Sequence, residues 1–307
     1  MIIDSFPADS RADTPRLPDT FCEVQDVDLH MHSTASDGVL SPGELVALCH
    51  RRGLTHMALT DHDTLAGVEE AAQAAAQAGI RLIPATELSC QWRGANIHVV
   101  ALLPRGGIGK LAEGLIRQAQ ARVIRAEVIA SRLEKLGLDN ALARARVQAG
   151  SERPLGRPDF AAALVEAGLV KDRASAFKKF LGSGKPGDVK AHWPFLSEVV
   201  EWIGGAGGVA VLAHPLRYGL TRRKRGLLLD AFVDVGGEAA ELISGFQNAD
   251  LTRDLARQLE GRGLYGSLGS DFHFPGGPLA PGAMSPPPRT DVTPVWLHPA
   301  LTGFSAR

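Results

Sequence analysis

Short apolar segments alternate with helical ones along the chain, and this order constrains the fold more than any other feature of the sequence. One helix is expected from Ser41, whose capping box with Glu44 marks its start, to Gly53, and another over the Ala-rich residues 65–78. Four apolar runs around and after these helices are typical of buried strands: residues 27–30, 56–60, 80–84 and 98–103. The resulting βαβα order predicts an α/β protein with a mostly parallel sheet.

The alternation is interrupted in the middle of the chain. One long helical pattern covers residues 108–136, and further helical segments follow over 159–181 without a strand-like run between them. We therefore predict a helical subdomain over residues 106–192, inserted into an α/β body that is made of residues 26–105 and 193–275. The second part of the body is expected to hold a helix near 196–205 and three strands, at residues 208–213, 238–243 and 264–268.

The two ends of the chain differ from this body in composition. Residues 1–25 have neither the basic start nor the apolar stretch of a secretory signal, so we expect a flexible tail there. The Pro-rich residues 276–307 are expected to be irregular chain on the surface. No apolar run approaches the roughly 18 residues of a membrane span. Cys22, Cys49 and Cys90 share no disulfide or metal-site spacing, which fits the cytoplasm.

Charge is unevenly distributed along the sequence. The formal net charge is −1, which argues against a general coat protein for long nucleic acids. Residues 105–190 hold 17 Lys or Arg against 9 Asp or Glu, whereas the rest of the chain holds 16 basic and 25 acidic residues. An acidic body beside a basic helical subdomain suits a metal site that faces a patch for an anionic substrate. Solvated charges on helix faces are the alternative explanation.

Most of the histidines occur together with acids at the ends of the predicted strands. In parallel α/β folds these strand ends gather on one face, where active sites form, so we expect the side chains to converge. The histidines at 50, 56, 192 and 298 lack such company and are interpreted as surface or core residues. The converging set consists of His30, His32, Asp37, His62, Glu87, His98, His214, Asp271 and His273.

This set of side chains predicts a metal centre. Imidazole and carboxylate groups together suit manganese, zinc or iron, and the absence of thiolates argues against a structural zinc finger. The candidates are too numerous for one ion, so two or three divalent ions are expected, with manganese preferred over zinc and iron. Clustered metals suit hydrolysis of phosphate esters, because they generate hydroxide near neutral pH and stabilise charge on phosphoryl oxygens.

Five sequence motifs, taken in order, resemble those of the polymerase and histidinol phosphatase (PHP) family: DLHMHSTASDG, ALTDHDT, PATELS, AHP and GSDFH. The resemblance covers about residues 26–275 and implies a distorted (β/α)7 barrel with a trinuclear metal site. Three further segments resemble the branch of 3',5'-nucleoside bisphosphate phosphatases, some of which are also 5'-to-3' exoribonucleases on short RNA. These segments are LGRPDFAAALVEAG, FLGSGKPGDV and GGVAVLAHPLRY.

The resemblance also implies roles for individual residues. It assigns His30, His32, Glu87 and Asp271 to the first ion, and Asp37, His62 and His273 to the second. A bridging Glu87, with His98 and His214, would hold the third. Asp37, His62 and Asp271, together with a metal-bound hydroxide, are the expected catalytic groups. One position departs from the branch, because Asp159 stands where its relatives usually carry His, and Asp cannot offer a cation to a phosphate.

Basic residues of the insertion are candidates for binding the substrate. Arg122 and Arg125 are one turn apart on the long predicted helix and share a face, while Arg157 and Lys185 lie in turns that carry Gly and Pro. Arg suits bidentate contacts with phosphate and Lys supplies a point charge. Arg217, just after His214, is a weaker candidate.

The leading hypothesis is a cytoplasmic metal-dependent phosphatase that removes the 3'-phosphate from nucleoside 3',5'-bisphosphates and gives 5'-monophosphates. Its expected ligands are a small nucleotide or a short RNA, without a membrane, long duplex nucleic acid or obligate protein partner. Two alternatives stay open: a histidinol-phosphate phosphatase, and a non-catalytic binding module that is stabilised by metal.

Overall fold

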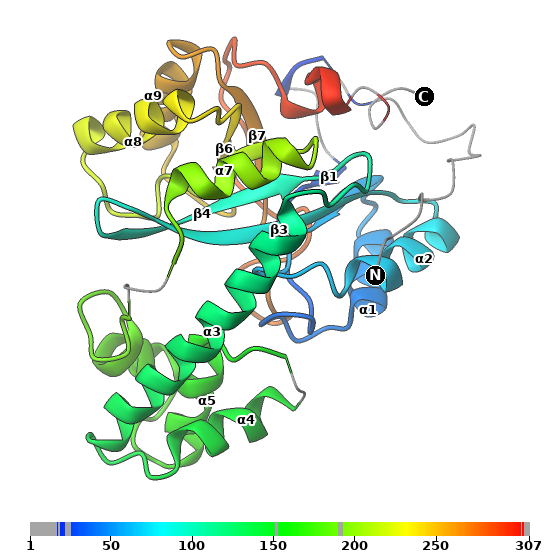
Figure 1. Cartoon of the computed structure of the whole chain (residues 1–307). Coiled ribbons are helices and arrows are strands. Elements are labelled where there is room, and N and C mark those ends of the chain that lie inside the picture. Colours follow the sequence, from blue (N-terminus) through cyan, green and yellow to red (C-terminus); the bar gives the residue numbers. More distant parts are fainter. Residues whose placement is uncertain are drawn as a thin grey trace.

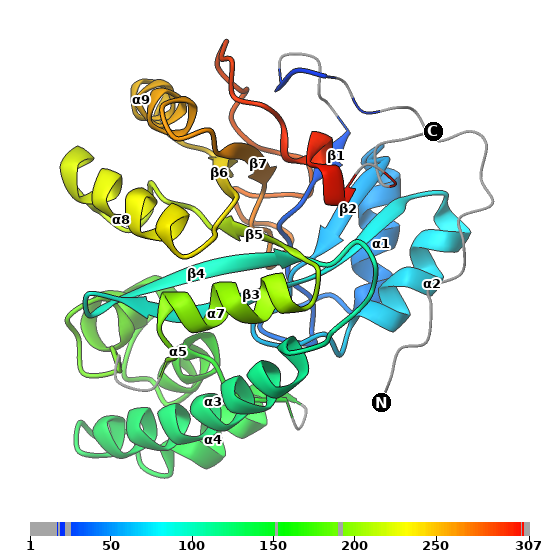
Figure 2. The same ribbon diagram turned by 45° about the horizontal axis from the view of Figure 1, so that its top comes forward.

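Seven strands form one curved sheet in the order of the chain. The structure is a computed structural model that describes residues 17, 19–21, 26–150, 153–189, 193–301 and 303. The first and last strands meet, since the Leu29 amide donates to the Leu268 carbonyl (3.1 Å) and the sheet becomes an almost closed barrel (Figures 1 and 2). The strands are β1 (Val27–Asp28), β2 (His56–Leu59), β3 (Arg81–Trp92), β4 (Ala95–Leu102), β5 (Val209–Leu212), β6 (Ala239–Ser244) and β7 (Tyr265–Gly269).

Strand β4 runs against the direction of its neighbours. The pairs β1/β2, β2/β3, β5/β6 and β6/β7 are parallel, as the βαβα order predicts, but β3/β4 and β4/β5 are antiparallel. The cause is a two-residue turn at Arg93 and Gly94, whose φ angles of 48° and 75° are those of a tight hairpin. The hairpin replaces a helical crossover and places Ser89 opposite His98, close to Glu87.

The barrel helices pack on the outside of the sheet (Figures 1 and 2). At the start of the first helix, Ser41 Oγ accepts from the Glu44 amide, and the Glu44 carboxylate accepts from the Ser41 amide, so the predicted capping box is confirmed. The last two helices, α8 and α9, have no counterpart in the sequence-based prediction. The barrel helices are α1 (Pro42–Arg51), α2 (Val68–Ala78), α7 (Leu196–Gly205), α8 (Arg222–Asp234) and α9 (Ala249–Glu260).

The middle of the chain forms a helical lobe that projects to one side of the barrel (Figure 1). Among its described residues there is no strand, and its buried side chains, including Ile129, Leu133, Phe160 and Leu164, form a core of their own. The first helix of the lobe joins it to the barrel at Gly114, where a Cβ atom would lie 2.4 Å from the Trp202 ring. The lobe consists of α3 (Leu111–Glu134), α4 (Ala141–Ala149), α5 (Arg157–Glu166), α6 (Arg173–Ala176) and the π-helix Phe177–Leu181.

Both ends of the described chain contribute to the barrel core. Most of the tail that we expected over residues 1–25 lies outside the described residues, but Leu17 and Phe21 are described and buried. The Phe21 ring contacts Trp296 edge to face at 5.3 Å, and Trp296 is fully buried within the Pro-rich segment. Two buried aromatic side chains each contribute about 2–3 kcal/mol to stability. The structure describes no helix that is long and apolar enough to cross a membrane.

Candidate metal centre

The structure brings all nine predicted ligand side chains into one buried cluster at one end of the barrel. Most of them follow a strand: the chain supplies two after β1, one after β2, one after β5 and two after β7. The β3–β4 hairpin supplies Glu87 and His98 from within its strands, and Asp37 comes from the loop before α1. Within the cluster, three groups of ligand atoms lie within 4.8 Å of one another.

The first group surrounds two imidazole nitrogens. Nε2 of His30 lies 3.1 Å from Nε2 of His32. The Oδ1 atom of Asp271 is 3.4 Å from the first of these nitrogens and 3.2 Å from the second. Oε2 of Glu87 approaches the same two atoms at 3.3 and 3.4 Å. Four potential ligand atoms therefore face one point.

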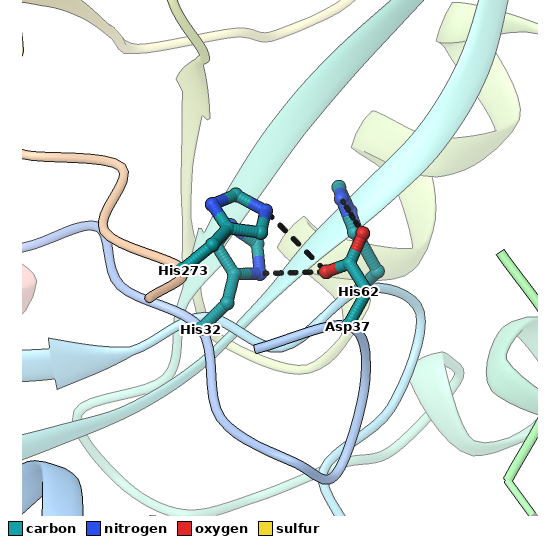
Figure 3. Close-up of side chains that lie close together, drawn as sticks. All are labelled: His32, Asp37, His62 and His273. Atoms are coloured by element: carbon teal, nitrogen blue, oxygen red, sulfur yellow. Dashed lines mark ion pairs between the residues drawn. The ribbon is translucent and has the colours of Figure 1, made fainter. Parts of the chain in front are cut away.

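The second group surrounds Asp37 and is drawn in Figure 3. Oδ1 of Asp37 lies 3.4 Å from Nε2 of His273 and 4.0 Å from Nδ1 of His32. Oδ2 of Asp37 lies 3.9 Å from Nε2 of His62. The stacked rings of His32 and His273, with centroids 4.2 Å apart, both face this carboxylate. Sequence reasoning expected His32 only in the first group, whereas the structure places it between the first and the second.

The third group is organised by Glu87. Its Oε1 atom is 2.8 Å from Nδ1 of His98 and 2.9 Å from Nε2 of His214, and its Oε2 atom is 3.0 Å from Nδ1 of His62. Because Oε2 also faces the first group, this one carboxylate contacts every part of the cluster. Such a position would suit a carboxylate shared between neighbouring ions.

Burial and the crowding of charge shift several pKa values in the cluster. Burial, with the nearby rings of His273 and His62, lowers the pKa of His32 to about 3, so this ring is neutral at pH 7. Burial opposes ionisation of Glu87, but the surrounding imidazoles, His98 first, hold its pKa well below the usual value. The same balance holds the pKa of Asp37 and Asp271 well below theirs. Although burial opposes it, the neighbouring carboxylates raise the pKa of His30, His62 and His273, the last to about 10. Metals bind neutral imidazole and ionised carboxylate, so metal binding at these three rings would displace protons.

Unsatisfied atoms show that these residues fit divalent metals. Buried polar atoms are normally hydrogen-bonded, yet within the part of the chain that the structure describes, Nδ1 of His32, Oδ1 of Asp37, Nδ1 of His62 and Nδ1 of His214 have no partner in hydrogen-bonding geometry. Cations near these atoms would satisfy them. The described cysteines, Cys49 and Cys90, are buried and free, so the donor set is purely nitrogen and oxygen.

Backbone strain is concentrated at the same place. His214 and Asp271 have φ angles of 32° and 56°, in the left-handed region that residues other than glycine rarely adopt. Such conformations cost about 1–3 kcal/mol each and persist only where the surroundings hold them. The Asp271 amide donates to the carbonyl of His30 (2.8 Å), and the His214 amide donates to Glu241 (2.6 Å). These bonds fix two candidate ligands where their strands end.

Three supporting acids were missed by sequence reasoning. Glu241 lies against His30 as well as His214, and Asp28 accepts from the amides of Ser270 and Gly282. Asp61 accepts from the hydroxyls of two serines in the loop that carries Asp37. Each is a buried acid within or directly after an apolar strand. For Glu241, an isolated acid inside an apolar strand was the signal that could have identified it, whereas Asp28 and Asp61 lie within the histidine motifs themselves.

Comparisons with known proteins agree with this geometry. The family model described as "PHP domain" matches residues 28–138. A 5'-3' exoribonuclease of Haemophilus influenzae is 44% identical over 81% of this chain and 90% of its own length. The chain belongs to the PHP family of phosphoesterases. A 3',5'-nucleoside bisphosphate phosphatase of Chromobacterium violaceum is 39% identical over 82% of this chain and 89% of its own length.

The PHP fold is also shared with a solved structure. An amidohydrolase from Chromobacterium violaceum, with bound sulfate and no metal, superposes with a TM-score of 0.82 at 38% identity. The match covers 88% of this chain and 94% of that one. It includes both the barrel and the helical lobe, since the barrel alone makes up a smaller share of the chain.

Two of the predicted substrate-binding arginines of this PHP protein are buried where α3 passes the barrel. Arg122 Nε donates to Asp63 Oδ2 (2.6 Å), and Asp63 also accepts from Ser89. Arg125 Nε donates to the Val189 carbonyl (3.2 Å). Both guanidinium groups lie over the Trp193 ring, with 5.4 Å to its centroid. Sequence reasoning placed these side chains on one face, and the structure shows that this face is turned inward.

The other three candidates differ in exposure. Arg157 is the first residue of α5, donates to the Leu181 carbonyl (3.2 Å) and lies over the Phe177 ring. Burial lowers the pKa of Arg157, while Asp188 and Asp37 oppose that shift, so this guanidinium lies within reach of the metal cluster's charge. Lys185 is exposed in a turn. Arg217 donates to Asp271 and to the Ser244 carbonyl (3.2 Å), which makes it a neighbour of the first metal group.

Proposed function

We propose that this PHP protein removes the 3'-phosphate from nucleoside 3',5'-bisphosphates, giving nucleoside 5'-monophosphates, and that it also degrades short RNA from the 5' end. Its relatives that carry these names, at 44% and 39% identity, support the proposal. A reducing cytoplasm as the place of action is part of the proposal and is supported by the two free buried cysteines.

One observation carries the choice of substrate. Asp37 and His62, from the second metal group, line the same cleft as Arg122. Arg122 and Arg125 lie over the same Trp193 ring, and burial, together with the like charges of Arg157 and Arg122, lowers the pKa of Arg125 to about 9. Mutual repulsion in a buried cluster is relieved by an anion. A substrate with two phosphates fits such a site, with one group at the metals and the other at the arginines.

Two or three divalent ions, preferably manganese, complete the proposed site. When bound, such ions lower the pKa of water and neutralise charge on phosphoryl oxygens. The proposed catalytic groups are Asp37, His62 and Asp271, with Arg217 orienting the last of them. The ligand sets are His30, His32, Glu87 and Asp271 for the first ion, Asp37, His62 and His273 for the second, and Glu87, His98 and His214 for the third.

Residues of the chain position the substrate for hydrolysis. Arg157 and Lys185 hold the remote phosphate by charge-assisted hydrogen bonds, and Arg122 and Arg125 add positive charge behind them. When these residues hold the remote phosphate in a fixed position, the scissile ester at the other end of the substrate is oriented toward the metal cluster.

A substrate panel tests the proposal. With manganese present, phosphate release is measured from adenosine 3',5'-bisphosphate, 3'-AMP, 5'-AMP and histidinol phosphate, and release of nucleoside 5'-monophosphates is measured from a short 5'-phosphorylated RNA, with metal content determined alongside. We expect the bisphosphate to have a kcat/KM at least about tenfold above that of histidinol phosphate, because only the bisphosphate of these two substrates has a second phosphate for the arginine cluster.

Matched histidine variants serve as controls in this panel. His62→Ala and Asp271→Ala should lose both metal and activity while the circular dichroism spectrum is kept. His298→Ala removes a histidine that pairs with Glu238 outside the cluster and should change neither. A preference for histidinol phosphate would favour that activity instead, and metal binding without any hydrolysis would favour a non-catalytic module.

A further inference from the structure

Arg153 and Asp159 form a bidentate ion pair at the start of α5 in the helical lobe. Nη2 of Arg153 donates to Oδ1 of Asp159 (2.7 Å), and Nη1 donates to Oδ2 (3.0 Å). The pair is largely buried, with the side chains 13% and 6% exposed, respectively. Parallel hydrogen bonds of this kind fix the plane of a guanidinium group and leave it little rotational freedom. Arg153 is therefore held in one orientation before any ligand arrives.

This ion pair lies at the metal cluster. Arg153 lines the cleft that Asp37, His62 and Arg122 also line. The turn that follows Arg153 touches the cluster as well, since a Cβ atom at Gly156 would lie 3.9 Å from Cβ of Asp37. A bisphosphate bound along this cleft would place one phosphate at the candidate metal ligands and the other at the Arg153 guanidinium.

Among the described residues, the arginines in or near the cleft all keep N–H groups without an acceptor, and Arg153 differs in that its bidentate pair with Asp159 fixes the direction of those that remain. Arg122 is paired with Asp63 through Nε, and Arg157 is directed to the Leu181 carbonyl and the Phe177 ring. Arg153 uses two N–H groups on Asp159 and one on the Pro154 carbonyl. Among the residues that the structure describes, its Nε–H and its second Nη2–H have no acceptor. A guanidinium has five N–H groups, so two remain for a ligand.

We propose that Arg153 is a substrate-binding residue that holds the phosphate remote from the scissile ester, and that Asp159 is the positioning residue that aims it. This inference rests on the proposed function, because it assigns one more contact to the bisphosphate. Asp159 also accepts from the Gly156 amide (2.8 Å), so a single carboxylate fixes both the arginine and the start of α5. Position 159, where sequence reasoning found no cation to offer, thus supplies one indirectly.

Whether neutralising Asp159 weakens or tightens phosphate binding shows whether Asp159 acts by positioning Arg153 or only through its own negative charge. A carboxylate next to a phosphate repels it, so electrostatics alone predicts tighter phosphate binding once Asp159 is neutralised. Positioning predicts weaker binding, because the released guanidinium regains rotamer freedom that the ligand must then remove. Asp159→Asn separates the two explanations well, since the amide oxygen still accepts from Gly156 and keeps the helix cap.

The test combines binding with kinetics on the full-length, manganese-loaded protein. Calorimetry measures the Kd of 5'-AMP, and assays give kcat and KM for adenosine 3',5'-bisphosphate and for p-nitrophenyl phosphate, which lacks a remote phosphate. The variants are Arg153→Ala, Arg153→Lys and Asp159→Asn. Arg144→Ala is the matched control, because Arg144 forms an exposed pair with Glu166 elsewhere in the lobe.

We expect Arg153→Ala to weaken 5'-AMP binding and raise the KM for the bisphosphate by about 10- to 100-fold, with p-nitrophenyl phosphate turnover unchanged. Arg153→Lys should recover part of the loss by keeping the charge. Asp159→Asn should weaken binding roughly fivefold in wild-type protein but have no effect in the Arg153→Ala background. Arg144→Ala should match the wild type throughout.

Other results would overturn the inference or the function separately. Unchanged 5'-AMP binding in Arg153→Ala, equal losses on both substrates, or tighter binding in Asp159→Asn would each contradict the assigned roles. So would a wild-type protein that does not bind 5'-AMP. If 5'-AMP binding depends on Arg153 but the wild type releases no 3'-phosphate, the proposed function fails and the phosphate contact stands.

Discussion

Nδ1 of His30 lies 2.5 Å from Oε1 of Glu241, and both side chains are buried. The other carboxylate oxygen of Glu241 accepts from the His214 amide at 2.6 Å. One acid on β6 therefore fixes the ring of one candidate ligand and the strained backbone of another. A carboxylate behind a metal-bound imidazole sets its tautomer and orients its second nitrogen toward the ion.

Replacing Glu241 should weaken metal binding without removing a ligand. We expect Glu241→Gln to lower manganese affinity by about 10- to 100-fold, since the amide can no longer fix the charge-assisted bond to His30. Competition with a fluorescent chelator measures the affinity. Glu238→Gln is the control, because Glu238 precedes the same strand but pairs with His298 outside the cluster. Equal affinities in both variants would show that Glu241 does not support the metal site.

The buried pair between Arg122 and Asp63 should matter for stability as well as for substrate. Their side chains are 10% and 1% exposed, and Asp63 adopts a left-handed φ of 54°. Among the described residues, Arg122→Ala leaves the buried Asp63 carboxylate with Ser89 as its one hydrogen-bond partner, so we expect a loss of about 3–5 kcal/mol in the free energy of unfolding. Urea denaturation measures it.

The control for this change is Arg117→Ala, on the same helix. Arg117 pairs with Glu198 at the surface, and such pairs contribute about 0–1 kcal/mol. If Arg122→Ala is as stable as Arg117→Ala, the pair is not a structural anchor, and Arg122 is free to serve the substrate alone.

The proposed phosphate clamp should separate two substrate classes. Arg157→Ala should lower kcat/KM for adenosine 3',5'-bisphosphate by about 10- to 150-fold, because a charge-assisted contact is lost, and should leave p-nitrophenyl phosphate turnover largely unchanged. Lys185→Ala should have a smaller effect that disappears as salt rises, because Lys185 is exposed. Equal losses on both substrates would assign these residues to the support of the barrel.

The free energy of unfolding should decrease as the pH is lowered below about 6.5, because the pKa of His56 is low in the folded protein. Burial, with the nearby charge of Arg81, lowers the pKa of His56 from 6.5 to about 4. Between these values the unfolded chain binds the proton more readily than the folded one, so stability is full above pH 6.5 and decreases as pH falls toward 4. The decrease attributable to this group is about 3 kcal/mol.

Comparison with His56→Asn isolates this effect. Asn keeps a polar atom near Thr55, whose Oγ1 lies 2.8 Å from Nδ1 of His56, but it does not titrate. Urea denaturation with chelator from pH 4 to 7.5 should show a shallower decrease in the variant. Parallel curves for the two proteins would contradict the pKa that burial imposes.

Local sequence signals predicted much of the barrel. Ser41 and Glu44 cap α1 as expected, and the C-terminal end of α7 lies at Gly205, as its pattern indicates. These features depend on neighbouring residues, so the sequence contains them directly. The hairpin at Arg93 and Gly94 was missed because Arg, unlike Asn or Asp, is no usual turn residue at positive φ.

Long-range packing determined what could not be predicted. Most of the nine candidate ligands could be recognised in the sequence because they are His and acidic residues close together near predicted strand ends, whereas Glu241 occurs alone in an apolar strand and contacts His30 only after folding. The inward direction of Arg122 depends on Asp63, a partner from another element. Phe21 lies in a polar, Pro-rich segment, and its burial depends on Trp296 at the far end of the chain.

The identity of the phosphate that leaves tests the account most directly. Adenosine 3',5'-bisphosphate is incubated with the manganese-loaded protein, and the products are followed by phosphorus NMR. We predict that inorganic phosphate and 5'-AMP appear in equal amounts, because the arginines hold the 5'-phosphate while the 3'-ester faces the metal cluster. Formation of 3'-AMP, or no hydrolysis by protein with its metals bound, would contradict the account.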